Sequence, residues 1–385
     1  MVGDMKPFRI DVPQSDIDDL IRRLENTRWP DELPGVGWTY GAPLGYIKEL
    51  TGYWRDRYDW RKWEARINEY PQFTTTIDGA NVHFLHARSP DPDAIPLLIT
   101  HGWPGSIVEY IELLGPLTDP KAHGETSAPA FHVVLPSIPG YGFSGPTHET
   151  GWSMQRVAKA WVELMRKLGY GRYGAHGGDW GSAISRELGV QDPDHVLGVH
   201  LTMLAGRPPG DPAAMSELTE RDKKSLEGLA YFMREGNGYF TQQSTRPQTL
   251  AYGLTDSPAG QLAWIVEKFW EWTDRETSPD DAVNRDHLLT NVSIYWFTAT
   301  AGSSARLYYE TAHSERNWAS EPEKSTVPTG AAAFPREIAS PIKAFASRSN
   351  NIVHWSEFDR GGHFAAMEEP DLLLADIRAF FGSLK

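Results

Sequence analysis

The chain has 385 residues, a formal net charge of −14 at pH 7 and no cysteine. The missing cysteine excludes disulfides, thiolate metal sites and cysteine catalysis, and the negative charge without a run of Lys or Arg argues against nucleic acid and anionic membranes as partners. Residues 1–13 lack the apolar segment of a signal peptide and no apolar run approaches about 18 residues, so we predict a cytoplasmic protein without a membrane span. The 15 Trp, 15 Tyr and 15 Phe residues indicate aromatic core packing, an aromatic-lined pocket, or both.

Residues 1–72 are predicted to form an N-terminal arm made of helices and loops. Four apolar residues fall on one face of a first helix: Ile17, Leu20, Ile21 and Leu24. Residues 31–43 are rich in Gly and Pro and predict a meandering loop, and an aromatic helical segment is expected from about 44 to 70. We expect this aromatic segment to pack on a larger body.

From residue 73 the hydrophobic pattern changes to that of alternating strands and helices. A hairpin is predicted at Asp78-Gly79, a dipeptide typical of two-residue turns, and an amphipathic helix over 153–168. Strands are expected at 73–77, 82–87, 96–100, 131–136, 170–176, 196–204, 327–334 and 352–359. The alternation is the signature of a mainly parallel sheet flanked by helices, which we divide into residues 73–205 and 326–385.

The stretch between these two parts, residues 206–325, carries no strand pattern. It is helical and rich in aromatic residues. Ligands of open α/β sheets bind at the carboxyl ends of the strands. We therefore expect this stretch to form a lid over that edge.

The segment GGDWGS at 177–182 follows a predicted strand and precedes a good helix sequence. Small residues on both sides of a reactive side chain are typical of a nucleophile elbow, in which a strand turns sharply into a helix. The reactive side chain here is Asp179, and a carboxylate nucleophile forms an alkyl ester with an electrophilic sp³ carbon. The alternative interpretation is a glycine-rich turn in which the aspartate caps the helix.

A nucleophile elbow predicts an acid and then a histidine later in the chain. His363 lies in the segment RGGHF just after the last predicted strand, and its glycines free the loop to present it. Glu337 follows the preceding strand, which is the expected place of the acid. Glu357 and Asp359 are rival acids, although they lie on or at the end of the last strand.

Two oxyanion donors are also expected near the elbow. One is the backbone N–H of the residue after the nucleophile, and the other comes from the loop after the third strand. The segment HGWP at 101–104 occupies that loop. We therefore predict an oxyanion hole formed by the backbone N–H groups of Trp103 and Trp180.

Taken together, these segments resemble the microsomal-type epoxide hydrolases of the α/β-hydrolase superfamily, over nearly the whole chain. The N-terminal arm and two lid segments, LLTNV at 288–292 and SSARLY at 303–308, resemble the family as well. The resemblance implies an α/β-hydrolase fold with an inserted helical lid and an N-terminal arm, no cofactor, and a small-molecule epoxide as partner. The membrane anchor of mammalian members is not visible here, which implies a soluble enzyme, with a homodimer as an open possibility.

The family uses two lid tyrosines as proton donors to the epoxide oxygen. By motif match these are Tyr308 and Tyr239. The adjacent Tyr309 is a rival for the first, and Tyr231 or Tyr252 could replace the second.

The reaction that the resemblance implies has two stages. Asp179 attacks a ring carbon to form an ester, and water activated by His363 and Glu337 then hydrolyses the ester to release a vicinal diol. The aromatic lid suggests a bulky, apolar or aromatic epoxide. Bacterial relatives serve in detoxification and in antibiotic pathways, including enediyne-type ones, and the residues do not choose between these roles.

Two alternative functions fit part of the pattern. A haloalkane dehalogenase shares the aspartate elbow but needs halide-binding donors in place of the tyrosines. A non-catalytic ligand-binding protein of the same fold would not need every catalytic position filled. An ordinary esterase is disfavoured because the elbow lacks Ser and Cys.

Overall fold

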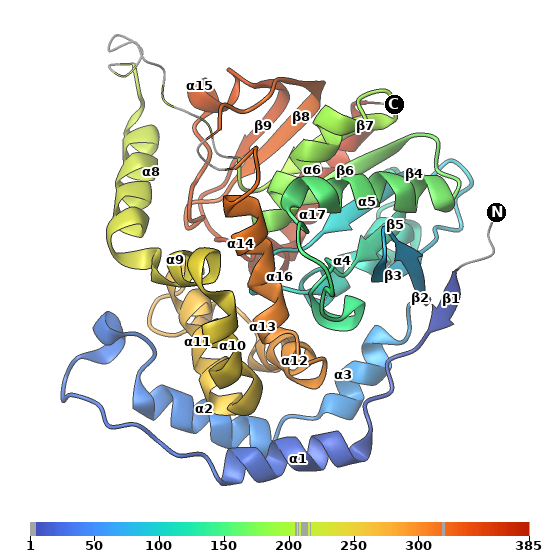
Figure 1. Cartoon of the computed structure of the whole chain (residues 1–385). Coiled ribbons are helices and arrows are strands. Elements are labelled where there is room, and N and C mark those ends of the chain that lie inside the picture. Colours follow the sequence, from blue (N-terminus) through green and yellow to red (C-terminus); the bar gives the residue numbers. More distant parts are fainter. Residues whose placement is uncertain are drawn as a thin grey trace.

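The chain is described from a computed structural model that places residues 5–204, 206, 208, 215, 217–317 and 320–384. These residues form a sheet with helices on both faces, a helical insertion beside it, and an arm that runs along the insertion (Figure 1). Residue 205, where we expected the first part of the sheet region to end, lies outside the described residues. None of the described helices is long and apolar enough to cross a membrane.

The strands form one nine-stranded sheet in the spatial order β1-β2-β3-β5-β4-β6-β7-β8-β9. Their bounds are β1 (Lys6–Phe8), β2 (Gln72–Ile77), β3 (Ala80–Ala87), β4 (Ile95–Thr100), β5 (Phe131–Pro136), β6 (Tyr173–Gly177), β7 (Val196–Leu201), β8 (Ser325–Ala333) and β9 (Asn350–Glu357). The strands from β5 to β9 in this order pair in parallel, and β1, β2 and β3 pair antiparallel at one edge. The predicted mainly parallel sheet is confirmed.

The hairpin between β2 and β3 turns at the predicted dipeptide. Asp78 and Gly79 both have positive φ, at 47° and 78°, and Ile77 pairs with Ala80 across the turn. Positive φ at both central residues matches the right-handed twist of the two strands, which explains why Asp-Gly occupies this turn.

Helices cover both faces of the sheet and enclose two cores. Helices α5 (Met154–Lys167) and α6 (Asp179–Gln191) lie on one face, and α4 (Ile111–Thr118) and α17 (Pro370–Gly382) lie on the other. Leu98 belongs to the core under the first pair, whereas its neighbours Leu97 and Ile99 belong to the core under the second. Successive strand residues point to opposite faces, so a strand buried on both faces has a continuous apolar sequence.

The helical insertion lies between β7 and β8, and we use this name for the helices α8 to α14. Their bounds are α8 (Glu220–Tyr231), α9 (Gly238–Thr245), α10 (Pro247–Asp256), α11 (Pro258–Trp272), α12 (Arg285–Phe297), α13 (Ala301–Ser304) and α14 (Arg306–Ala312), with a π-helical turn η5 (Phe232–Gly236) and a 3₁₀ turn η6 (Pro279–Asp281). Shorter elements elsewhere are η2 (Ile107–Tyr110), η3 (Lys121–His123), η4 (Gly142–Ser144), α15 (Lys343–Ala346) and α16 (Ala365–Glu368).

The arm contains α1 (Gln14–Glu25), η1 (Gly37–Tyr40), α2 (Leu44–Asp56) and α3 (Trp60–Ile67), and it differs from the prediction in two ways. Strand β1 joins it to the sheet, in a segment too short for a hydrophobic pattern to reveal. The helix expected over 44–70 is broken, because Asp59 caps a new helix by accepting a hydrogen bond from the Lys62 backbone N–H at 3.3 Å.

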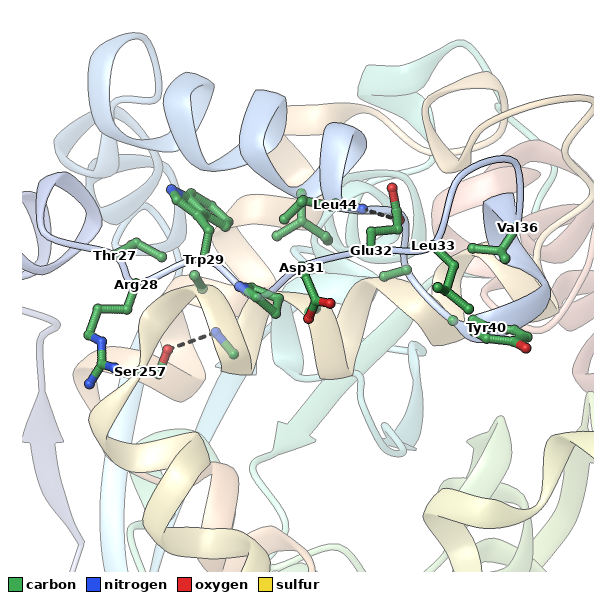
Figure 2. Close-up of a pocket in the computed structure, with 17 residues that line it drawn as sticks. Thr27, Arg28, Trp29, Asp31, Glu32, Leu33, Val36, Tyr40, Leu44 and Ser257 are labelled. Carbon is green, nitrogen blue, oxygen red and sulfur yellow. Dashed lines mark hydrogen bonds between the residues drawn. The ribbon is translucent and has the colours of Figure 1, made fainter.

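The arm loop between α1 and α2 lies across the start of α11. Figure 2 shows residues 27–36 running over this helix, with Ser257 at its N-terminal end. A cavity of about 440 Å³ remains between loop and helix. The arm thus packs on the insertion while β1 pairs with the sheet.

Candidate active site

Asp179 occupies the turn from β6 into α6 with a φ of +49°, a left-handed conformation that is uncommon for a residue with a side chain. The glycines around it allow the strand and helix to come close. A Cβ on Gly181 would lie 1.8 Å from the Thr100 carbonyl oxygen, and one on Gly177 would lie 2.3 Å from the Gly181 carbonyl. The N-cap of α6 is Gly178, so Asp179 does not cap the helix, and the geometry is that of a nucleophile elbow.

The Asp179 carboxylate is buried and faces the two backbone donors that we expected. Oδ1 accepts a hydrogen bond from the Trp103 N–H at 2.8 Å, and the Trp180 N–H also donates to the carboxylate. Burial raises the pKa of Asp179, while the charge of His363 and the two N–H groups act in the opposite direction. These donors lie where an oxyanion on this carboxyl group would need them.

His363 and Glu337 meet beside Asp179, and both are buried. His363 Nδ1 lies 2.5 Å from Glu337 Oε1, and His363 Nε2 lies 3.5 Å from Asp179 Oδ2. Glu337 Oε1 also accepts a hydrogen bond from the Ile338 N–H at 2.8 Å. Burial lowers the pKa of His363, but the carboxylates of Glu337 and Asp179 outweigh it and raise the pKa to about 9.

The two rival acids lie away from His363. Glu357 is exposed and accepts a hydrogen bond from Trp355 Nε1 at 2.9 Å. The Asp359 side chain is 91% exposed, beside Arg360. The structure therefore brings Glu337, and neither rival, to the histidine.

The predicted tyrosines Tyr239 and Tyr308 come from α9 and α14 and are both buried. The ring of Tyr239 stacks on Trp103 with centroids 5.0 Å apart, and the ring of Tyr308 lies edge-on to Trp180 at 4.8 Å. Burial raises the pKa of both hydroxyls well above 10, so they keep their protons at neutral pH. The two hydroxyls are close enough to interact with each other, and the Tyr308 side chain also interacts with Trp180.

The rival tyrosines lie farther out. Tyr231 is 45% exposed and Tyr252 is 72% exposed. Tyr309 is partly buried and stacks on His313 with centroids 4.0 Å apart. None of these rings joins the group around Asp179.

Two cavities approach this group from the side of the insertion. A groove of about 1550 Å³ is lined by Tyr239 and Lys268, among others, and a smaller cavity of about 300 Å³ is lined by Trp272 and Glu337. Asp179 lines neither cavity. The cavity under the arm loop in Figure 2 reaches none of the predicted site residues.

One group of residues in the described part of the chain could hold a metal ion. His200, His354 and Asp376 offer ligand atoms within 4.8 Å of one another. Asp376 Oδ2 contacts His200 Nε2 at 2.9 Å and Asp376 Oδ1 contacts His354 Nε2 at 2.7 Å, so the three side chains already satisfy one another. The group lies outside the set that faces Asp179.

Several residues near the site have no signal in the sequence. Trp272 lies edge-on to His363 with centroids 5.0 Å apart. Glu109 and Glu368 are carboxyl groups whose pKa is raised to about 8, chiefly by burial. They belong to no motif that marks them, because only the fold brings them to the site.

The elbow with its aspartate, the acid and histidine after the last two strands, and the inserted helices define an α/β-hydrolase. Two family models match the chain: "alpha/beta hydrolase fold" over residues 95–290 and "Epoxide hydrolase N terminus" over residues 5–110. The chain belongs to the epoxide hydrolase family, and it is an epoxide hydrolase. The predicted fold and the predicted family are both confirmed.

Named relatives agree with this assignment. Epoxide hydrolase 1 of Sus scrofa is 38% identical over 99% of this chain and 89% of its own length. A Stigmatella aurantiaca protein, provisionally named an epoxide hydrolase, is 46% identical over 98% of this chain and 85% of its own length. The solved structure of Aspergillus niger epoxide hydrolase superposes with a TM-score of 0.87 at 32% identity, covering 99% of this chain and 96% of that one.

Proposed function

We propose that this epoxide hydrolase works through an alkyl ester on Asp179 and in two half-reactions. The observation that carries the proposal is the position of the Asp179 carboxylate. It lies in the elbow, with the Trp103 N–H on one oxygen and His363 Nε2 at 3.5 Å from the other. An ionised carboxylate can displace at an sp³ carbon without activation, which explains an aspartate in place of serine.

In the first half-reaction an Asp179 oxygen attacks a ring carbon of the epoxide, and the carbon–oxygen bond of the ring breaks. Tyr239 and Tyr308 hydrogen-bond the ring oxygen, and one of them gives it a proton. Support comes from the burial of both phenols near Trp103 and Trp180 and from the interaction of the two hydroxyls with each other. The product is a hydroxyalkyl ester of Asp179.

In the second half-reaction His363 takes a proton from water, and the water oxygen attacks the carbonyl carbon of the ester. Glu337 orients the imidazole and stabilises its positive charge. The Trp103 and Trp180 N–H groups hold the oxyanion, and one such donor contributes about 3 kcal/mol in comparable sites. Collapse breaks the ester bond, and protonated His363 gives its proton to the alkoxide. The remaining proton of the attacking water returns to the tyrosine that gave one up, so Asp179 is ionised again when the vicinal diol leaves.

The substrate proposed here is a bulky, apolar or aromatic epoxide. The two predicted tyrosines belong to a group of aromatic rings that contact one another: Trp103, Trp180, Tyr239, Phe240, Trp272 and Tyr308. Stacked and edge-on rings favour apolar and aromatic groups by burial and ring contacts. A role in detoxification or in an antibiotic pathway stays a prediction.

The experiment that tests the mechanism traps the ester. The His363→Gln variant is mixed with styrene oxide, and peptides are analysed by mass spectrometry. We expect an adduct of the epoxide's mass on the Asp179 peptide, because the second half-reaction lacks its base. Adding Tyr308→Phe to this variant removes a proton donor and should slow adduct formation by about 100-fold or more.

Asp179→Asn is the control and should form no adduct. If the wild-type enzyme converts the epoxide to a diol while no adduct ever maps to Asp179, the ester mechanism is wrong. The haloalkane dehalogenase alternative would require halide release from haloalkanes without diol formation, which the family assignment does not favour.

A further inference from the structure

The loop that carries His363 is fastened to the helical insertion. The His363 N–H donates to the carbonyl oxygen of Trp272, the last residue of α11, at 2.9 Å. Two residues earlier in the loop, the Gly361 N–H donates to Asp274 Oδ2, also at 2.9 Å. Trp272 and Asp274, at and just after the end of α11, therefore hold the loop backbone at His363 and at Gly361.

A single carboxylate makes the corresponding connection on the other side of the histidine. Glu368 Oε2 accepts a hydrogen bond from the Asp274 N–H at 2.8 Å, and Glu368 Oε1 accepts one from the Phe364 N–H at 3.0 Å. Burial raises the pKa of Glu368 to about 8, and the two N–H donors partly oppose that rise. Glu368 thus bridges the insertion to the residue that follows His363.

The contact between loop and insertion is close enough to exclude a side chain. A Cβ on Gly362 would lie 2.4 Å from the Trp272 carbonyl oxygen and 3.1 Å from Glu368 Oε1. The ring of Phe364 stacks on that of Phe269, in α11, with centroids 4.0 Å apart and planes 2° from parallel. The second glycine of RGGHF is therefore explained by the approach of the insertion.

We propose that residues 272–274 and Glu368 form a clamp that positions the His363 imidazole for hydrolysis of the Asp179 ester. Asp274 and Glu368 are positioning residues in this clamp, since they act on His363 through the backbone of Gly361 and Phe364. The inference rests on the proposed two-step mechanism, and it has a specific consequence. His363 acts as a base only in the second half-reaction, so a loosened clamp slows hydrolysis and leaves alkylation of Asp179 near the wild-type rate.

The clamp also connects the insertion to both half-reactions. Tyr239, Tyr308 and Trp272 belong to helices of the insertion, and Asp274 lies in the segment that connects α11 to η6. The same helical body that presents the proton donors therefore also holds the base. A displacement of a reacting group by about 1 Å can cost 100-fold in rate, so the hydrogen bonds to the loop are expected to matter.

The test compares three variants under single-turnover conditions with styrene oxide. Asp274→Ala removes the acceptor for the Gly361 N–H, whereas Asp274→Asn keeps an acceptor oxygen and is the matched control. Glu368 accepts hydrogen bonds from the N–H groups of Asp274 and Phe364. Glu368→Gln keeps an acceptor oxygen for one of them and places an NH₂ group against the other. Rapid quenching and intact-protein mass spectrometry measure how fast the ester forms and how fast it disappears, and thermal melts check that each variant is folded.

We expect the Asp274→Ala and Glu368→Gln variants to hydrolyse the ester about 10- to 100-fold more slowly, to accumulate it in the steady state, and to form it at the wild-type rate. Asp274→Asn should behave like the wild type. The clamp is disproved if Asp274→Ala accumulates no more ester than Asp274→Asn, or if both half-reactions slow together. These results differ from failure of the mechanism itself, in which no ester appears on Asp179 in any variant, including His363→Gln.

Discussion

At the scale of single residues, the chemistry depends on which groups face the Asp179 carboxylate. Its oxygens face the backbone N–H groups of Trp103, at 2.8 Å, and Trp180, and His363 Nε2 lies 3.5 Å from Oδ2. Burial disfavours the ionised form of this carboxylate, and all three groups favour it. The same carboxylate helps to keep His363 protonated, so the charge of Asp179 and the protonation of the base are linked.

This linkage predicts how ester hydrolysis depends on pH. In the resting enzyme the carboxylates of Glu337 and Asp179 outweigh burial and raise the pKa of His363 to about 9. Ester formation removes the charge of Asp179, so the pKa of His363 falls in the intermediate. Only neutral His363 can accept a proton from water, so the hydrolysis rate should rise with pH and level off below about pH 9.

The dependence of the hydrolysis rate on pH is measured by forming the ester first and then following its decay between about pH 5 and 10. Alkylation is complete before the decay begins, so only hydrolysis is observed. Glu337→Gln removes the other carboxylate that raises the pKa of His363. The midpoint of the rise in hydrolysis rate should therefore move to still lower pH, and the maximal hydrolysis rate should fall because the imidazole is less well oriented. A rate that falls as pH rises would contradict the role of His363 as a base.

At the scale of the elements, the elbow requires that α6 begin directly against β4. The closest approach is between Gly181 and the Thr100 backbone, and it is what allows Asp179 to stand above the sheet with a positive φ. The loop after β4 also supplies Trp103, so the same approach brings the oxyanion donor to the carboxylate. The clamp at the end of α11 performs a similar task for the loop after β9.

Gly181→Ala is expected to destabilise the protein strongly. The new Cβ would lie 1.8 Å from the Thr100 carbonyl oxygen, and both partners are backbone, so neither can rotate away. Overpacking of this kind costs about 1–3 kcal/mol or more in the free energy of unfolding. Urea denaturation monitored by tryptophan fluorescence measures the change.

Gly228→Ala in α8 is the matched control, since nothing lies within 4 Å of its added Cβ. In the interior of a helix this change should stabilise by about 0.5–1 kcal/mol. Equal effects of the two substitutions would show that the close approach at Gly181 is not needed.

At the scale of the whole molecule, the arm joins the sheet and the insertion into one body. Strand β1 pairs with β2, while α1 and α2 pack on α11, and α3 packs on α12. Polar contacts accompany this packing. Trp54 Nε1 donates a buried hydrogen bond to Ser293 Oγ at 3.0 Å, and Tyr58 OH makes a partly buried one with Thr290 Oγ1 at 2.9 Å. The arm therefore helps to fix the position of the insertion, which carries Tyr239 and Tyr308.

Trp54→Phe should lower stability without changing the chemistry. The substitution removes the hydrogen bond to Ser293 and part of a buried ring, and the loss is expected to be about 1–3 kcal/mol in the free energy of unfolding. Urea denaturation measures the stability, and the rate of ester formation should stay near the wild-type value. Tyr53→Phe, at a partly exposed contact with Asp286, is the control and should cost less. A large drop in ester formation with unchanged stability would assign Trp54 a role in the site.

Much of the candidate site could be predicted from motifs that lie at the ends of strands. Asp179, Glu337 and His363 each follow a strand with a clear hydrophobic pattern, so their convergence at one edge of the sheet could be predicted. Tyr239 depended on family resemblance, because a tyrosine in an aromatic helix has no local feature that marks a proton donor. Strand β1 was missed, since three residues are too few to establish a period.

By itself, then, the amino-acid sequence determined most of the elements, their order and the chemistry-bearing residues, because hydrophobic period, turn residues and reactive side chains are local properties. Only the tertiary structure decided which carboxylates surround His363 and what holds its loop. Glu368 lies five residues after the histidine and Asp274 lies 89 residues before it, and no local pattern marks either one. Their hydrogen bonds to the loop depend on how the insertion settles on the sheet, and that is a property of the packed molecule.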